Sequence, residues 1–358
     1  MDPQITQNTF CTYTGSPSSA ETTIFFISGN PGLIGYYHPF LSFLAQNLVE
    51  SSDHSKPIYQ IYGCSLGGFE VDENPSSNDL NSQGNKTGRE ESKLYDLEDQ
   101  IRFVHQRLET VMSESGPNAA PNRKAVLIGH SVGAYIAMEV IRRHRAMDVS
   151  FDIVGGVMLF PTVMDIAASP SGQKLTGLLS IIPRLALVVG FFARLLTFIL
   201  PVVALRSVVG VVMKDPPGHA LDTTCTFLRS RGSVRQALYV SSSSSSSSSL
   251  LLFDLIVQHR HMAADEMRTI TSDKWTDDVW GVAHAREPIT KMFFYFGVND
   301  HWVAEKTRDD IIAARGEKEG SGTKMFVCEE GLPHAFCIKH SETMARKVAD
   351  MIQDITSA

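Results

Sequence analysis

The chain has 358 residues, of which 43% are hydrophobic and 20% charged, so it is long enough for one large α/β domain with an insertion, or for two domains. This mixture excludes wholesale disorder, and a formal net charge of −7 lacks the basic balance typical of nucleic-acid-binding proteins. The five cysteines are scattered without a C-x-x-C motif, which argues for a reducing compartment and against a disulfide framework or a zinc site. Because the N-terminus lacks the basic-then-apolar pattern of a secretory signal, we expect a protein that faces the cytosol.

The first half of the chain alternates short apolar runs with amphipathic stretches. Buried strands are predicted at residues 22–28, 57–62, 125–128 and 153–160. Helices are predicted at residues 36–49, 93–112 and from the end of the third strand to His144, and a loop at residues 73–92. Strands that alternate with helices in this way predict right-handed β-α-β crossovers and a mostly parallel sheet with helices on both faces.

The alternation stops after residue 160 and resumes near residue 290. Strands at 291–297 and 324–328 alternate with helices at 304–314 and 335–355. We therefore predict a core of residues 1–160 and 289–358, with residues 161–288 inserted as a large apolar cap. The nine consecutive serines Ser241–Ser249 inside this insertion predict a disordered connector.

The motif Gly129-His130-Ser131-Val132-Gly133 stands where a predicted strand ends and a helix begins. This is the G-x-S-x-G nucleophile elbow, in which small residues two before and two after the serine let the strand and the helix approach each other. The elbow would place the Ser131 hydroxyl above the carboxyl ends of the strands, where open α/β sheets bind ligands. The alternative is a tight turn with a capping serine, but the strand–helix context favours a nucleophile.

A serine hydroxyl needs a histidine base and an acid that orients the base, and in this fold they follow the serine in the order acid, histidine. His334 comes after the last predicted strand, so a loop can carry its imidazole over Ser131. Asp300 and Asp165 each follow the end of a strand and are the two candidates for the acid. We prefer Asp300, because its strand, loop and helix adjoin those of His334.

The negative charge that develops on the substrate oxygen requires two backbone N–H donors. Val132, directly after the serine, supplies the first. The loop Ser28-Gly29-Asn30-Pro31-Gly32 supplies the second, and we expect the donor to be Asn30, because proline has no N–H. An ordinary Pro-Gly turn explains this loop equally well.

Several of these segments resemble the lipid droplet-associated hydrolase family. They are Phe26–Gly32 followed by Tyr36-Tyr37, Ile128–Tyr135, Phe296-Gly297 with Asp300-His301-Trp302, Asp265-Glu266-Met267 before Trp280-Gly281, and Pro333–Phe336. The resemblance implies an α/β-hydrolase fold, a lipid ester or related acyl substrate, and association with lipid droplets and the endoplasmic reticulum. It also implies the triad Ser131, Asp300 and His334. The serine tract and the loop at 73–92 lie outside the resemblance.

Residues 175–213 form an unusually apolar segment of the insertion. No uncharged run in it reaches the ~20 residues of a spanning helix, and Pro201 would break a helix into two pieces. Spaced arginines along a Leu/Val/Phe surface predict an interfacial helix that lies on a lipid monolayer, although a buried helical cap would also explain the apolar content. The residues expected to contact the membrane are Arg184, Phe191, Phe192, Arg194, Leu195, Leu196, Phe198 and Arg206.

These observations favour a serine hydrolase that acts on lipid acyl esters, such as sterol esters, at the cytosolic surface of lipid droplets and of the endoplasmic reticulum. No cofactor, metal or nucleic acid is expected. Two alternatives remain open. One is a lipid-droplet binding or structural protein with little turnover. The other is a soluble thioesterase or carboxylesterase that uses the same triad under a dry cap.

Overall fold

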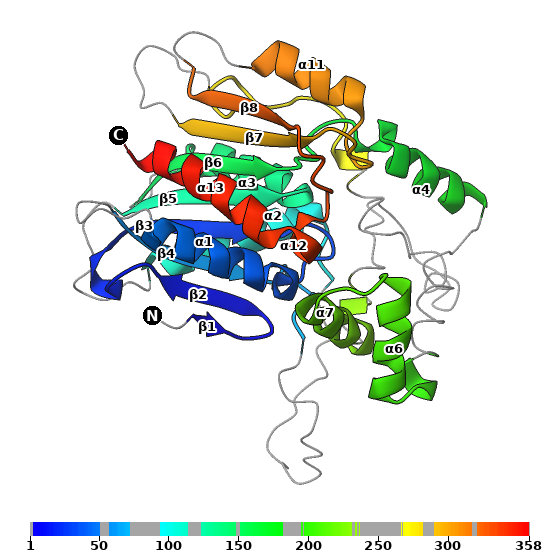
Figure 1. Ribbon diagram of the computed structural model, residues 1–358. Helices are drawn as coiled ribbons and strands as arrows, with labels where there is room; N and C mark the ends of the chain where they lie inside the picture. Colours follow the sequence, from blue (N-terminus) through cyan, green and yellow to red (C-terminus); the bar gives the residue numbers. More distant parts are fainter. Residues whose placement is uncertain are drawn as a thin grey trace, which may run out of the picture.

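The computed structural model describes residues 3–50, 57–71, 94–113, 123–147, 151–181, 195, 197–230, 233–234, 236, 266, 268–281, 290–316 and 321–357 (Figure 1). The predicted loop at 73–92 and the serine tract lie outside these residues. All five cysteines lie within them and are free thiols.

The described residues form an eight-stranded sheet in the order β1-β2-β4-β3-β5-β6-β7-β8. Its strands are β1 (Gln4–Ile5), β2 (Thr9–Tyr13), β3 (Ala20–Ile27), β4 (Ile58–Cys64), β5 (Lys124–His130), β6 (Asp152–Leu159), β7 (Lys291–Gly297) and β8 (Thr323–Cys328). Six neighbouring strands, β4-β3-β5-β6-β7-β8 in sheet order, pair in parallel, as predicted. Strands β1 and β2 add an antiparallel edge next to β4.

Helices cover both faces of the sheet (Figure 1). On one face α1 (His38–Glu50) packs against α13 (Ser341–Thr356), and α2 (Leu97–Ser113) and α3 (Val132–His144) pack on the other. The remaining core elements are η1 (Pro17–Ser19), η2 (Ile34–Tyr37), η3 (Ile166–Ala168), α11 (Glu305–Arg315) and α12 (Phe336–Lys339). The predicted apolar stripe of α2 is buried from Leu97 to Val111. The helix begins at Leu97 rather than at Lys93, because the Asp96 carboxylate accepts the N–H of Asp99 at 2.7 Å and caps the helix there.

The helix predicted at 335–355 is in fact two helices, α12 and α13, that meet at His340. The carbonyl of Cys337, which a continuous helix would use for its own backbone bond, accepts the Ser341 hydroxyl at 3.0 Å and the imidazole Nε2–H of His219 at 3.1 Å. Competition of this kind by side-chain donors ends or bends helices. Helix α12 itself begins two residues after His334.

The insertion contributes α4 (Pro170–Ile181), α6 (Val202–Val212) and α7 (Gly218–Arg229), which lie beyond one end of the sheet and not on its faces (Figure 1). Residues 268–281, which the sequence analysis assigns to the insertion, pack on the core instead. Trp280 is fully buried, and the indole N–H of Trp275 donates to the buried carboxylate of Glu139 in α3 at 2.8 Å. Residues 268–281 therefore pack as part of the core.

Candidate active site

The turn between β5 and α3 has the backbone of a nucleophile elbow. Ser131 has φ 56° and ψ −125°, a strained conformation for a residue with a side chain. A Cβ atom on Gly129 would lie 2.4 Å from the carbonyl oxygen of Gly133, and one on Gly133 would lie 2.4 Å from the carbonyl oxygen of Ile27. Both contacts are with backbone that cannot move aside. The glycines of the motif are therefore required so that β3, β5 and α3 can meet beneath the serine.

Gly133→Ala is expected to lower the free energy of unfolding by about 2 kcal/mol or more, because the added methyl group overpacks a site walled by backbone. Gly210→Ala in α6 is the control, since a Cβ there has no atom within 4 Å, and the helix gains up to ~1 kcal/mol. Denaturant unfolding of both variants checks the difference. Equal stability of Gly133→Ala and the unsubstituted chain would contradict the close approach.

The side chains of Ser131, His334 and Asp300 form a continuous hydrogen-bonded line. Nε2 of His334 lies 2.9 Å from Oγ of Ser131, and Nδ1 lies 2.7 Å from Oδ2 of Asp300. The second oxygen of Asp300 accepts the backbone N–H of Trp302 at 2.8 Å, and its side chain is 1% exposed. A buried carboxylate that is held at both oxygens fixes the plane of the imidazole. The arrangement has the geometry that a serine needs to lose its proton to a neighbouring base.

The acid that reaches the histidine is Asp300 and not its rival. Asp165 follows β6 and stands at the start of η3 with φ 46°. Asp300 follows β7, which pairs with β8, the strand that precedes His334. Adjacent strands thus deliver the acid and the base to the same edge of the sheet.

The loop after β3 lies directly against the serine. A Cβ on Gly29 would come within 2.9 Å of the Cβ of Ser131, so only glycine permits this approach. The N–H of Gly29 donates to the hydroxyl of Tyr37 at 3.2 Å, and the amide of the Asn30 side chain donates to Glu266 at 3.3 Å. Val132 stands at the first position of α3, where backbone N–H groups have no partner within the helix. Of the two expected oxyanion donors, Val132 follows Ser131 in the chain, and Asn30 follows Gly29 and lines the same cavity as Ser131.

A cavity of about 360 Å³ opens onto this line of side chains. Ser131 and His334 lie in its wall with Asn30 and Glu266, and Met213, the residue after α6, closes it from the insertion. Most of its other lining residues are apolar or aromatic, and two are polar: Pro31, Tyr36, Tyr37, Ile166, Trp302, Ala335, Cys337 and Ile338, with His130 and Thr162. An apolar cavity with a few convergent polar groups is typical of a site for small, mainly apolar ligands.

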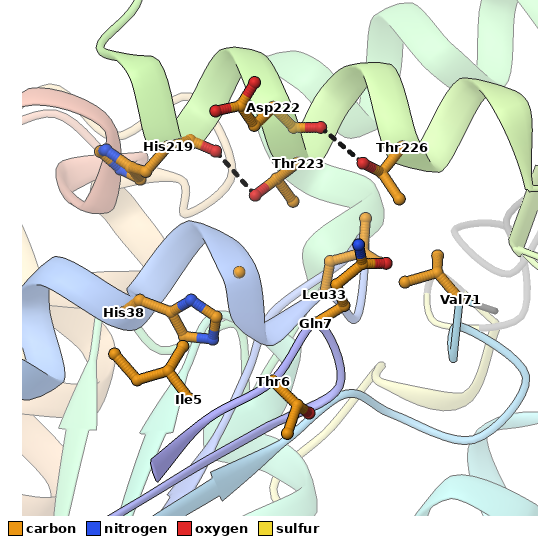
Figure 2. Close-up of a pocket in the computed structure, with 11 residues that line it drawn as sticks. Ile5, Thr6, Gln7, Leu33, His38, Val71, His219, Asp222, Thr223 and Thr226 are labelled. Carbon is orange, nitrogen blue, oxygen red and sulfur yellow. Dashed lines mark hydrogen bonds between the residues drawn. The ribbon is translucent and has the colours of Figure 1, made fainter. Parts of the chain in front are cut away.

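A larger cavity, of about 600 Å³, lies between the N-terminal strands and α7 (Figure 2). The hydroxyls of Thr223 and Thr226 donate to carbonyls of their own helix, and the Asp222 carboxylate pairs with Arg206. None of the line Ser131–His334–Asp300 is in its wall. Size therefore does not identify the reactive cavity here; the presence of a nucleophile beside a base does.

Helix α7 contacts both sides of the smaller cavity. The hydroxyls of Tyr36 in η2 and Thr224 in α7 lie 2.8 Å apart, and His219 donates to the carbonyl of Cys337 in α12. Helix α6 packs on α7 through Leu205, Val209 and Cys225. The insertion is thus hydrogen-bonded to η2, before Ser131 in the chain, and to α12, after His334.

Several apolar side chains of α6 and of the segment before it are exposed. They include Phe198 at 90% exposure, before the helix, and Val203 at 76%, Val211 at 79% and Val212 at 74% within it. Helix α6 begins directly after Pro201, where the sequence predicts a break. Among the described residues, no helix is both long and apolar enough to cross a membrane.

Three of the residues expected at a membrane lie in the described part of the chain. Leu195 and Phe198 are exposed, but Arg206 forms an ion pair with Asp222 of α7 instead of standing alone on the surface. Arg184, Phe191, Phe192, Arg194 and Leu196 lie outside the described residues.

The sequence did not point to Tyr37 or His130 as part of this site. Both are buried, line the same cavity as Ser131, and have side chains bonded to each other. The only available signal was position, because His130 precedes the serine and Tyr37 follows the Asn-Pro-Gly loop within a few residues.

The family model for lipid-droplet associated hydrolases matches residues 20–247 and 244–337 of the chain. The lipid droplet-associated hydrolase of Gallus gallus is 28% identical over 336 residues, which are 92% of this chain and 83% of that protein. The Homo sapiens protein of the same name is 25% identical over 335 residues, or 92% and 84% of the two chains. That of Dictyostelium discoideum is 24% identical over 353 residues, or 95% and 90%.

Solved structures similar to this chain include the haloalkane dehalogenase DbeA from Bradyrhizobium elkani, with a TM-score of 0.51, 13% identity and coverage of 99% of this chain and 98% of that chain. A meta-cleavage product hydrolase, CumD, has a TM-score of 0.50 at 12% identity, with coverage of 97% and 94%. At such identities the likeness concerns the fold alone, and it confirms the predicted α/β-hydrolase fold. With the family match across most of its length, the chain belongs to the lipid-droplet associated hydrolase family.

Proposed function

We propose that this protein is a serine carboxylic-ester hydrolase that acts on lipid acyl esters, including sterol esters and other neutral lipids. Its place of action would be the surface of lipid droplets and the cytosolic face of the endoplasmic reticulum, where it would serve lipid storage and turnover. The observation that carries the proposal is the 2.9 Å contact between Ser131 and His334, with Asp300 bonded behind the histidine at 2.7 Å.

The proposed reaction follows from this geometry. Nε2 of His334 takes the proton of Ser131 as Oγ attacks the ester carbonyl, and the same nitrogen then returns the proton to the leaving alcohol. The Asp300 carboxylate holds Nδ1–H and stabilises the imidazolium that forms between these steps. The N–H groups of Val132 and Asn30 hold the oxyanion. Water attacks the acyl-serine in the second half of the reaction, again with His334 as the base.

The proposed lipid substrate rests on the cavity and on the surface beside it. The cavity wall is mostly apolar, and Met213 connects it to the end of α6. Val203, Val211 and Val212 of α6 are each more than 70% exposed, which a dry, buried cap does not require. A phospholipid monolayer over a neutral-lipid core would cover this face, and the core would supply the substrate from the same side.

A fluorophosphonate probe tests the reaction class on the purified full-length protein. The probe reacts with a serine only when a neighbouring base activates it. We expect one label per chain, on the peptide that carries Ser131, and faster hydrolysis of emulsified sterol or glycerol esters than of short soluble esters. An unlabelled Ser131 would favour a binding protein of the droplet surface, and a preference for soluble thioesters or short esters would favour a soluble esterase.

Replacing Val203, Val211 and Val212 together by aspartate is expected to weaken binding to artificial lipid droplets at least tenfold, since about 1.5 kcal/mol or more is lost for each apolar side chain that would be buried. These side chains are exposed, so the fold and the hydrolysis of soluble esters should not change. Val49→Asp, on α1 and 48% exposed, is the matched control and should bind as the unsubstituted chain does. Undiminished flotation of the triple variant with droplets would contradict the proposed lipid face.

A further inference from the structure

A chain of buried hydrogen bonds runs behind Ser131 and joins the two loops that flank it. The hydroxyl of Tyr37 accepts the N–H of Gly29 at 3.2 Å and lies 2.8 Å from Nδ1 of His130. Nε2 of His130 lies 2.9 Å from the backbone carbonyl of His334. Both side chains are almost fully enclosed, Tyr37 at 4% exposure and His130 at 4%.

The directions of these bonds follow from what each group can donate. A carbonyl only accepts, so Nε2 of His130 carries a proton and donates it to His334. Burial lowers the pKa of His130 well below its usual range, so the ring is neutral and its Nδ1 has no proton. Nδ1 must therefore accept the hydroxyl proton of Tyr37, whose pKa burial raises well above 10. The oxygen of Tyr37 is then oriented to accept from Gly29.

Each end of this chain of bonds holds a part of the reactive site. Gly29 approaches Ser131 closely and is followed by Asn30, the second proposed oxyanion donor. His334 at the other end carries the imidazole that receives the serine proton. Both ring nitrogens of His130 are bonded within the protein, Nδ1 to the hydroxyl of Tyr37 and Nε2 to the carbonyl of His334.

We propose that His130 and Tyr37 are positioning residues that hold the oxyanion loop and the His334 loop at a fixed separation across Ser131. The proposal rests on the proposed function, in that it assigns Ser131 and His334 their roles. The residue before the nucleophile thus bridges the two loops, together with Tyr37, in the wall of the same cavity. Displacements of about 1 Å of reacting groups can lower rates by about 100-fold, so a loss of either bond should appear in the chemical step.

The first test removes one hydroxyl. Tyr37→Phe retains the ring, which packs 4.7 Å from Phe26 between centroids, but leaves Gly29 and His130 without their partner. We expect kcat per titrated active site on a soluble ester to fall by about 10- to 100-fold with KM unchanged, and the rate of fluorophosphonate labelling to fall equally. Tyr59→Phe loses a buried hydroxyl bonded to Thr356 at 2.7 Å, far from the site, and should keep the unsubstituted kcat. A normal kcat for Tyr37→Phe would overturn the proposal.

The second test separates the two ends at His130. Glutamine has a side-chain N–H in the place of Nε2 and can still donate to the His334 carbonyl, whereas alanine cannot. We expect the kcat of His130→Gln to be at least tenfold higher than that of His130→Ala. Both values are measured per titrated active site, so that unfolded protein is not counted. Equal kcat values for the two variants would overturn the anchoring role.

The third test requires no turnover and so separates this proposal from the proposed function. In protein labelled with ¹⁵N-histidine, the His130 signals are assigned by their absence in His130→Gln. We expect a neutral ring at pH 7 with its proton on Nε2 and none on Nδ1. A proton on Nδ1 would overturn the network even if Ser131 is labelled. Failure to label Ser131 beside an intact Nε2–H would instead count against the proposed hydrolase.

Discussion

Ser131→Ala is expected to lower kcat for ester hydrolysis by about 10⁶-fold and to abolish fluorophosphonate labelling. The methyl side chain of alanine cannot form the acyl-enzyme, although the N–H donors and the cavity remain. A small residual rate over water is expected from these donors. The substitution removes a single oxygen atom that lies in the cavity wall, so stability should change little.

Ser207→Ala is the matched control for this experiment. Its hydroxyl donates to the carbonyl of Val203 on the surface of α6, and its loss should leave both kcat and labelling intact. Binding to lipid droplets should be the same in both variants, since neither changes the exposed valines of α6. Ester hydrolysis that survives in Ser131→Ala would mean that another group carries the reaction.

The three reactive side chains could be found from the sequence because each follows a predicted parallel strand. Ser131 follows β5, Asp300 follows β7 and His334 follows β8, and the carboxyl ends of parallel strands meet at one edge of a sheet. The sequence also favours Asp300 over Asp165, because the strand, loop and helix of Asp300 adjoin those of His334. What it leaves open is the contact itself, since both acids follow a strand end and only the folded structure shows which carboxylate reaches the imidazole.

The positioning pair was beyond the reach of the sequence. The bond between Tyr37 and His130 joins residues 93 apart, and the bond between His130 and His334 joins residues 204 apart. No local pattern encodes such pairs, because each side chain alone is typical of an ordinary core residue. The proposed role of His130 depends on its contacts with Tyr37 and with the carbonyl of His334, which only the folded chain brings together.

The parallel core was predictable and its antiparallel edge was not. Strands β3 to β8 are apolar runs next to helical patterns, which sequence reasoning detects. Strand β2 (Thr9–Tyr13) alternates half-buried and buried residues over five positions, and β1 has only two residues. Such short edge strands gain their order from pairing with a sheet that already exists, here with β4.

The spacing of arginines in the insertion could not show which of them pair within the protein. The sequence predicts that Arg206 contacts a membrane, but its spacing carries no information on the neighbouring helix α7. In the folded protein Asp222 of α7 reaches Arg206 and forms an ion pair with it. The apolar side chains of α6 remain exposed, so the proposed lipid face depends more on its valines and Phe198 than on this arginine.

Asp300→Asn is expected to lower kcat by about 10⁴-fold with little change in KM or in stability. Asparagine fits the same space, and its carbonyl oxygen can still accept the N–H of Trp302, which Asp300 accepts at 2.8 Å. Its amide N–H would then face Nδ1 of His334 and favour the tautomer with the proton on Nε2, directly opposite the hydroxyl of Ser131. A ring protonated at that nitrogen cannot take the serine proton, so acylation slows while substrate binding persists.

The control for this prediction is Asp165→Asn, the rival acid. Asp165 has a left-handed backbone, which asparagine adopts as readily as aspartate, so the substitution should preserve the fold. Steady-state kinetics on a soluble ester and the rate of fluorophosphonate labelling should both fall in Asp300→Asn and remain normal in Asp165→Asn. The reverse result would transfer the orienting role to the end of β6, and a loss in neither variant would mean that His334 acts without an acid. Because the two carboxylates follow different strands of the same sheet, this pair of substitutions decides which strand end completes the site.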